Sequence, residues 1–201
     1  MKDRQGALIV SSSESVFSTM RRMLRGTDFA FVRYAPTMTK AKQQLARDSF
    51  GLVIIYTPLP DEFGLESAAE LSERWYGGIV LMVAQDIYEQ ARRKVRGTGV
   101  CLLSKRVSGA EFLQAVDIVM AQVSRMQRIT QEYDRLKRKL AELNDVSRAK
   151  CLLIERERMT EEEAHEFLVH EAMNTGKTRK AVAEHILRKY GRPSQTGGVN
   201  K

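Results

Sequence analysis

The sequence LVIIY at residues 52–56 is an uninterrupted run of apolar side chains, and IVLMV at residues 79–83 is a second one. Continuous apolar runs of this length, rich in β-branched residues, are typical of parallel strands that are buried on both faces of a sheet. Two further runs, at residues 7–10 and 31–34, precede these two, and another follows them at residues 100–103. The five runs therefore predict five strands.

Longer stretches with helical spacing of apolar residues separate the five runs, as at Val16, Met20 and Met23. These stretches are long enough to form right-handed crossover connections between parallel strands. A strand followed by a helix, repeated five times, predicts an α/β domain over residues 1–122. We expect a five-stranded, doubly wound parallel sheet with helices on both faces.

The composition of the 201 residues is that of an ordinary globular protein, with 43% hydrophobic and 29% charged residues, which argues against a disordered or fibrous chain. No apolar run is long enough to span a bilayer, and the first residues lack the pattern of a signal peptide. We therefore expect a cytoplasmic protein that has no membrane partner. Cys101 and Cys151 lie far apart without metal-ligand spacing, so two buried, reduced thiols are expected.

A long helix is predicted from about Ser108, where Ser108 and Glu111 have the spacing of a capping box. From residue 126 the apolar side chains recur at alternating intervals of three and four, which is the heptad pattern of a coiled coil. We expect residues 123–145 to form a dimerisation helix, the alternative being an amphipathic helix that folds back on its own chain. The predicted seam consists of Met126, Ile129, Tyr133, Leu136, Leu140 and Leu143.

A small module of three short helices is predicted at residues 146–190, and the first helix is expected at residues 146–156. Thr160 and Glu163 form a second predicted capping box, and Gly176 suits the end of the helix that begins there. Residues 191–201 are expected to form a flexible tail. The predicted core of the module consists of the small residues Ala149, Ala164, Ala172 and Ala183, with Leu153, Phe167, Leu168, Val182 and Ile186 between them.

The net charge of +8 is concentrated toward the end of the chain. Residues 177–192 hold six basic side chains and a single acidic one, Glu184. Such clustering is typical of proteins that bind polyanions, because each neutralised phosphate releases condensed counterions. A solvated helix face would give the same pattern, so the charge alone does not decide between the two.

Residues 52–60 (LVIIYTPLP) and 99–105 (GVCLLSK) resemble the receiver domain of two-component response regulators, and the likeness extends over about residues 6–122. The family implies an acidic pair after the first strand that holds Mg²⁺, and an aspartate at the end of the third that is phosphorylated.

In this chain Ser11 and Ser12 occupy the positions of the acidic pair, Tyr56 occupies the phosphoacceptor position, and Lys105 matches the family's lysine. A phenol cannot replace a carboxylate in acyl-phosphate chemistry, and Mg²⁺ needs carboxylate oxygens. We expect a pseudo-receiver that undergoes no aspartyl phosphorylation and is controlled by a regulatory protein or a small ligand.

The sequence contains no recognisable set of catalytic residues. His165 and His170 are five residues apart, which does not place both on one helix face, and no glycine-rich phosphate loop is present. We therefore expect a protein that is not an enzyme and that has no cofactor and no metal site.

Residues from about 136 to 187 resemble the ANTAR domain, an RNA-binding antiterminator module, through RAK at residues 148–150, TEEEA at residues 160–164 and AM at residues 172–173. Cys151 and Asn144 depart from the family pattern. The resemblance implies that the chain binds paired hairpins in nascent leader RNA and contacts their loops. The candidate RNA-binding residues, all expected to be exposed, are Arg148, Lys150, His170, Asn174, Lys177, Thr178, Arg179 and Lys180.

Three functions remain open at this point. The first is an RNA-binding transcription antitermination regulator that acts as a homodimer. The second is a protein-interaction adaptor whose basic helices bind an acidic partner. The third is an active phosphorelay receiver, which is disfavoured because Tyr56 stands at the phosphoacceptor position.

Overall fold

The structure is a computed structural model, and it describes residues 5–190. The chain divides into two compact units with the boundary between Ile129 and Thr130, and each is described by itself. The predicted domain boundaries at residues 122 and 145 remain predictions. The predicted flexible tail, residues 191–201, lies outside the described residues.

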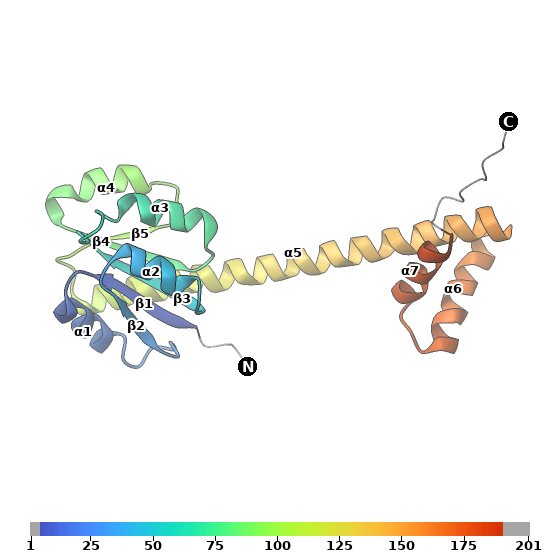
Figure 1. Ribbon diagram of the computed structural model, residues 1–201, viewed down its shortest axis with the longest axis horizontal. Coiled ribbons are helices and arrows are strands. Elements are labelled where there is room, and N and C mark those ends of the chain that lie inside the picture. Colours follow the sequence, from blue (N-terminus) through green and yellow to red (C-terminus); the bar gives the residue numbers. More distant parts are fainter. Residues whose placement is uncertain (1–4, 191–201) are drawn as a thin grey trace, which may run out of the picture. The chain divides into compact units, whose positions relative to one another are not determined.

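The first unit contains a five-stranded parallel sheet, as predicted (Figure 1). The strand order is β2-β1-β3-β4-β5, so the order reverses between β1 and β3. In doubly wound sheets, ligands bind at such a switch point, beyond the carboxyl ends of the strands. The strands are β1 (Gly6–Ser11), β2 (Val32–Ala35), β3 (Phe50–Tyr56), β4 (Gly78–Val83) and β5 (Cys101–Ser104).

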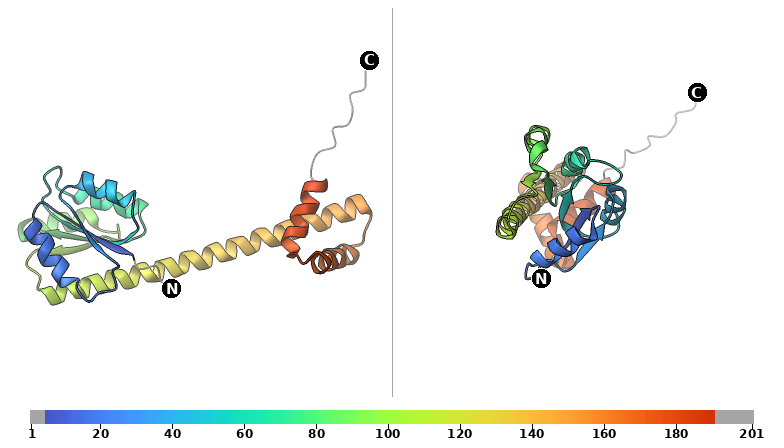
Figure 2. Two further views of the ribbon diagram at one scale, coloured as in Figure 1. Left: turned by 60° about the horizontal axis from the view of Figure 1, so that its bottom comes forward. Right: turned by 90° about the vertical axis from the view of Figure 1, so that its left-hand side faces the viewer.

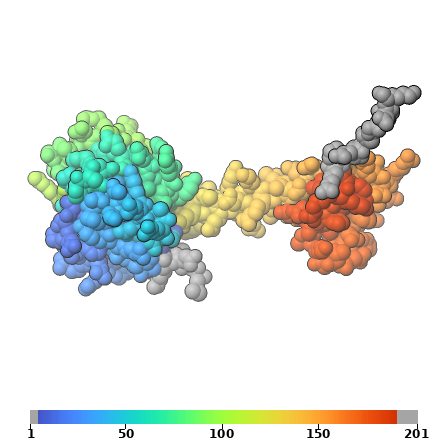
Figure 3. All heavy atoms as spheres, in the orientation of Figure 1, coloured from blue at the N-terminus to red at the C-terminus, as the bar shows by residue number. Residues whose placement is uncertain are grey.

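Helices cover both faces of this sheet. The start of α5 and helix α1 lie on one face, and α2, α3 and α4 lie on the other (Figure 2). The atoms of this unit form one closely packed body in the space-filling view (Figure 3). The helices of the unit are α1 (Glu14–Met23), α2 (Met38–Leu45), α3 (Leu65–Arg74), the short 3-10 helix η1 (Gln85–Ile87), α4 (Tyr88–Val95) and the beginning of α5 (Gly109–Glu157).

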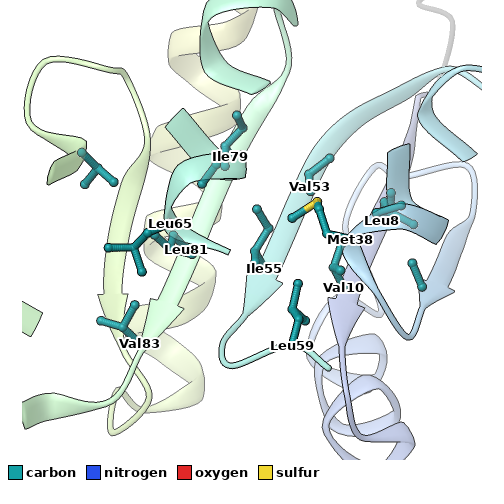
Figure 4. Close-up of a cluster of buried hydrophobic side chains, with 14 of the residues drawn as sticks. Leu8, Val10, Met38, Val53, Ile55, Leu59, Leu65, Ile79, Leu81 and Val83 are labelled. Carbon is teal, nitrogen blue, oxygen red and sulfur yellow. The ribbon is translucent and has the colours of Figure 1, made fainter. Parts of the chain in front are cut away.

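The continuous apolar runs bury alternate side chains in two separate cores. On β3, Val53 and Ile55 pack in the core beneath α2, α3 and α4 (Figure 4), whereas Leu52 and Ile54 pack against α1 and α5. A strand that is buried on both faces cannot alternate apolar with polar residues, which is why these runs are uninterrupted. The two cores fix the carboxyl ends of the strands at a single edge of the sheet.

Helix α5 is a single helix of 49 residues, Gly109–Glu157. Its first turn has the predicted capping box, because the Ser108 amide donates to Glu111 and the Glu111 amide donates to the Ser108 hydroxyl. Residues 146–156, predicted as the first helix of the module, are helical and form the last part of α5, without a break from the long helix. No proline or glycine occurs within residues 144–147 to interrupt the helix.

The second unit is completed by α6 (Glu161–Thr175) and α7 (Arg179–Tyr190), which pack against the end of α5. The Thr160–Glu163 capping box is present, and the hydrogen bonds from Thr160 lower the pKa of the Glu163 carboxyl. The core contains every residue that was predicted for it except Phe167, whose side chain is 39% exposed. Phe167 directly precedes the fully buried Leu168 on α6, and consecutive helix positions face in directions about 100° apart.

Replacing Leu168 by alanine should destabilise the second unit by about 2–5 kcal/mol, because Leu168 is 1% exposed and its loss leaves a cavity. Phe167→Ala is the matched control and should cost clearly less, on the order of 1 kcal/mol. Urea unfolding of the full chain distinguishes the units, since the single tryptophan, Trp75, reports only on the first. In Leu168→Ala, the unfolding transition followed by far-ultraviolet circular dichroism should shift to lower urea concentration. The transition followed by Trp75 fluorescence should stay unchanged.

The two cysteines differ from expectation in one respect. Cys101 is partly buried, and burial raises the pKa of its thiol, whereas Cys151 is exposed on α5 rather than buried. The neighbours of Cys151 explain this, because Leu153 and Ala149 occupy the buried face of the helix. Within residues 5–190, no helix is long and apolar enough to cross a bilayer.

Candidate functional site

The polar edge of the first unit brings together the residues that the sequence singled out. Ser11, at the end of β1, is the register partner of Tyr56 at the end of β3, and Tyr56 in turn faces Met82 of β4. Lys105 follows β5, and its amide donates to the carbonyl of Val83. Ser11, Tyr56 and Lys105 therefore lie at the carboxyl edge of the sheet, as predicted.

Two contacts define the chemistry of this edge. The Ser11 hydroxyl is buried and bonded within the turn, because it donates to the Ser13 carbonyl and accepts from the Ser13 amide. The Lys105 ammonium lies 4.2 Å from the centre of the Tyr56 ring, which is a cation–π contact. Burial lowers the pKa of Lys105, and the negative charge of Asp86 partly opposes that effect.

Two carboxylates of the loop after β3, those of Asp61 and Glu62, are engaged away from this edge. Asp61 accepts hydrogen bonds from the amides of Met38 and Thr39 at the start of α2, and these bonds lower the pKa of its carboxyl. Glu62 accepts from the Ser67 hydroxyl. Across the part of the chain that the structure describes, no group of three or more histidine, cysteine or acidic side chains is placed to hold a metal ion.

Incubation with a small phosphodonor and Mg²⁺ should therefore leave the chain unmodified. The reason is that Tyr56 replaces the carboxylate nucleophile and that serines stand where the Mg²⁺ ligands would be. Intact-mass spectrometry measures the result directly, with an active receiver domain treated in parallel as the control. A phosphoryl adduct that hydroxylamine removes would show that another carboxylate of this chain is a phosphoacceptor.

The turn between α6 and α7 carries the predicted basic residues of the second unit. Gly176 has a left-handed backbone with φ of 64°, and the Lys177 amide donates to the carbonyl of Ala172, which is the arrangement of a Schellman motif. This motif ends α6 and fixes the path of the chain at Lys177. Thr178 then begins α7, since its hydroxyl accepts from the Ala181 amide.

The cations of this turn differ in their pairing. Lys180 pairs with Glu184 on the same helix at 3.8 Å. Lys177 and Arg179 are exposed, and neither has a carboxylate within 4.0 Å among residues 5–190. The first turn of α7 contains no acidic residue, so its helix dipole adds to the positive charge there. The turn between α6 and α7 therefore favours the binding of an anion.

Lys150 does not share this surface, and it is less exposed than predicted. Its side chain is 22% exposed, and its ammonium lies 3.0 Å from the carboxylate of Glu161 at the start of α6. Helix α6 has 15 residues, which at ~1.5 Å per residue separates its two ends by about 21 Å. Lys150 and Lys177 are therefore at opposite ends of α6.

The remaining candidates are placed as follows. His170 and Asn174 are exposed and four residues apart on α6, so they lie on one face and lead toward the turn. Arg148 is exposed on α5 and has no ion pair with any described residue. Thr178 is exposed, but its hydroxyl serves as a helix cap.

The predicted seam on α5 is exposed along its whole length. The exposed fractions of its six side chains lie between 54% for Ile129 and 65% for Tyr133 and Leu143. Both the dimerisation helix and the alternative of a helix that folds back on its own chain remain predictions. Six apolar side chains at heptad spacing, left in solvent, are the pattern of a helix that pairs with another.

Both units resemble known proteins. The first unit has the fold of solved receiver domains. A signal receiver domain of an HD domain-containing protein from Pseudomonas fluorescens Pf-5 is 22% identical, with a TM-score of 0.57 over 64% of this chain and 96% of that one. A CheY-like receiver domain protein from Methanospirillum hungatei JF-1 is 15% identical, with a TM-score of 0.53 over 61% of this chain and 98% of that one. At these identities the likeness establishes the fold alone.

The first unit is thus a receiver-like domain, and α5 continues from it into a small helical module. Residues 134–187 match the ANTAR domain family, so this segment is an ANTAR domain that follows a receiver-like fold. The transcriptional regulatory protein PdtaR of Mycobacterium tuberculosis, in two strains, is 26% identical to it over 192 residues, which is 94% of this chain and 92% of that protein.

Sequence reasoning missed two features of the site. The ion pair of Lys150 with Glu161 joins residues eleven positions apart across a helix–helix corner, and no local pattern signals such a pair. The other is a set of methionines beside Tyr56, namely Met20, Met23 and Met82. Their helical and strand spacing identified them only as core residues.

Proposed function

We propose that this protein is an RNA-binding transcription antitermination regulator that binds hairpins in nascent leader RNA. The observation that carries the proposal is a pair of exposed cations, Lys177 and Arg179, which have no carboxylate partner among residues 5–190 and which the Schellman turn holds at the start of α7. The ANTAR family match at residues 134–187 supports RNA as the polyanion.

The loop of an RNA hairpin suits this surface better than the stem does. The major groove of an A-form stem is deep and narrow, whereas loop bases are unstacked and present their edges. His170 and Asn174 supply an aromatic ring and an amide beside the cationic turn, and these groups can stack on bases and hydrogen bond to base edges. Lys177 and Arg179 would contact the phosphates, which position the RNA.

A homodimer formed through the seam on α5 would present two such surfaces. Each surface alone is small and would bind a single loop weakly. Linking two sites makes the second binding event intramolecular, and the effective concentration then raises the overall affinity. Two hairpins in one leader transcript match two sites in one dimer.

The receiver-like domain would control this binding without aspartyl phosphorylation. Tyr56 and Ser11 stand where the reaction needs carboxylates, and the Lys105 ammonium rests on the Tyr56 ring. Control by a bound protein or a small molecule fits these residues, since neither needs a phosphoacceptor.

Binding of the full chain to labelled RNA tests the proposal. A two-hairpin RNA should bind more tightly than a duplex of the same length and charge, with affinity that falls steeply as salt is added. Equal affinity for hairpin and duplex would contradict loop recognition. Failure to bind either, together with salt-sensitive binding to an acidic protein, would favour the adaptor.

A further inference from the structure

A cavity in the first unit lies directly beside the degenerate receiver edge. It has a volume of about 220 Å³ and opens between α1, the ends of β3 and β4, and the loop from β5 into α5. Tyr56 and Lys105 form part of its wall. It is smaller than the roughly 300–1,000 Å³ that is usual for drug-sized ligands, so it suits a small metabolite.

The walls of the cavity are apolar and deformable. The side chains of Met20, Met23 and Met82 contribute three thioethers, and Phe112 contributes a ring from α5. Thioethers are polarisable, adapt to irregular shapes and make favourable contacts with aromatic rings. Rings also pack against one another in edge-to-face or offset arrangements. These walls favour a flat aromatic body over a polar one.

The polar groups of the cavity are few and carry one net positive charge. Four lining residues carry hydroxyls, Ser15, Thr19, Tyr56 and Ser108, and Lys105 provides the single ammonium. No carboxylate lines the cavity, and within the described chain no carboxylate lies within 4.0 Å of the Lys105 nitrogen. The ammonium lies over the Tyr56 ring; burial lowers its pKa, and the more distant charge of Asp86 partly opposes that effect.

The charge of the ligand follows from this arrangement. An incoming monoanion would replace a cation–π contact by a charge-assisted hydrogen bond, which is the stronger interaction at a partly dry site. A phosphate dianion would have only one of its two negative charges compensated, because Lys105 is the only cation in the wall. A cation would be repelled by Lys105 and would find no carboxylate in the wall.

We propose that this cavity binds a small aromatic carboxylate, with the ring among the three methionines and Phe112 and the carboxylate on Lys105. The ligand would sit beside Tyr56, the residue at the phosphoacceptor position, on the face of the sheet that α1 and α5 cover. The binding claim concerns the first unit alone and is independent of the RNA-binding proposal.

Benzoate is the probe, and the full chain labelled at its methionine methyl groups gives the readout. Methionine methyl signals assigned by Met→Leu variants should show saturable shifts for Met20, Met23 and Met82 on titration with benzoate. Met38 packs in the opposite core, and Met173 is exposed on α6, so both should stay unchanged and serve as internal controls. Benzamide, which has the same shape without the charge, should bind at least about tenfold more weakly.

Two variants separate the parts of the proposal. Lys105→Gln should lower benzoate affinity by at least about tenfold and leave benzamide affinity unchanged, because only the charge is removed. Thr19→Trp fills the cavity and should abolish binding of both, with unchanged Met38 signals as evidence that the fold is intact. The proposal is overturned if benzoate gives no saturable shift at these three methyl groups, or if Lys105→Gln binds benzoate as the native chain does.

Discussion

The double variant Lys177→Ala/Arg179→Ala should bind hairpin RNA at least about tenfold more weakly than the native protein at low salt. Both side chains are exposed and unpaired with any described carboxylate, so their removal takes away phosphate contacts without breaking an ion pair. The slope of log affinity against log salt should become shallower by about 2, one for each lost contact. Filter binding or fluorescence anisotropy over a salt series measures both quantities.

The matched control removes the same charge from another part of the second unit. Arg156 is in the last turn of α5 and Arg188 is in the last turn of α7, and both are exposed. Arg156→Ala/Arg188→Ala should keep most of the affinity for hairpin RNA and most of the slope of log affinity against log salt. If the two double variants lose affinity equally, RNA binding depends on net charge and not on the α6–α7 turn.

The second large effect is expected at the seam on α5. Leu136→Asp/Leu140→Asp should convert a dimer into a monomer at micromolar concentration, because each carboxylate placed in an apolar seam costs several kcal/mol to desolvate, roughly 2–7 kcal/mol for an uncompensated polar group. Sedimentation velocity gives the oligomeric state directly. The monomer should also bind a two-hairpin RNA more weakly while retaining its affinity for one hairpin.

Two positions on the outer face of the same helix provide the control. Gln131→Asp/Ala141→Asp adds the same negative charge outside the heptad positions and should leave the dimer intact. A Leu136→Asp/Leu140→Asp protein that stays dimeric would place the contact between subunits on another surface.

The fold was predictable because several local signals agree with the long-range contacts. The runs at β3 and β4 are apolar at every position since both faces of each strand are buried, and that requirement is visible in sequence. The capping boxes at Ser108 and Thr160 mark helix starts by hydrogen bonds that span only three residues. The register that pairs Ser11 with Tyr56 is a finding of the structure, because the sequence placed both residues at strand ends without giving the order of the strands.

The site was less predictable because exposure and pairing depend on tertiary packing. Lys150 was predicted to contact RNA together with Lys177, yet the fold places it beside Glu161 at the far end of α6 from Lys177. Phe167 is apolar but points partly to solvent, because Leu168 already fills the core at that level. The cavity could not be foreseen, since a hollow depends on where the side chains of α1, β3, β4 and α5 stop short of one another.

The contact between the α6–α7 turn and a hairpin loop is the central claim, and photo-crosslinking tests it most directly. The full chain is bound to a two-hairpin RNA that carries 4-thiouridine only in its loops, irradiated and digested, and the crosslinked peptides are identified by mass spectrometry. Crosslinks should fall within residues 170–180, near His170, Asn174 and Lys177. Crosslinks confined to the receiver-like domain, or to the surface around Lys150 and Glu161, would contradict this account.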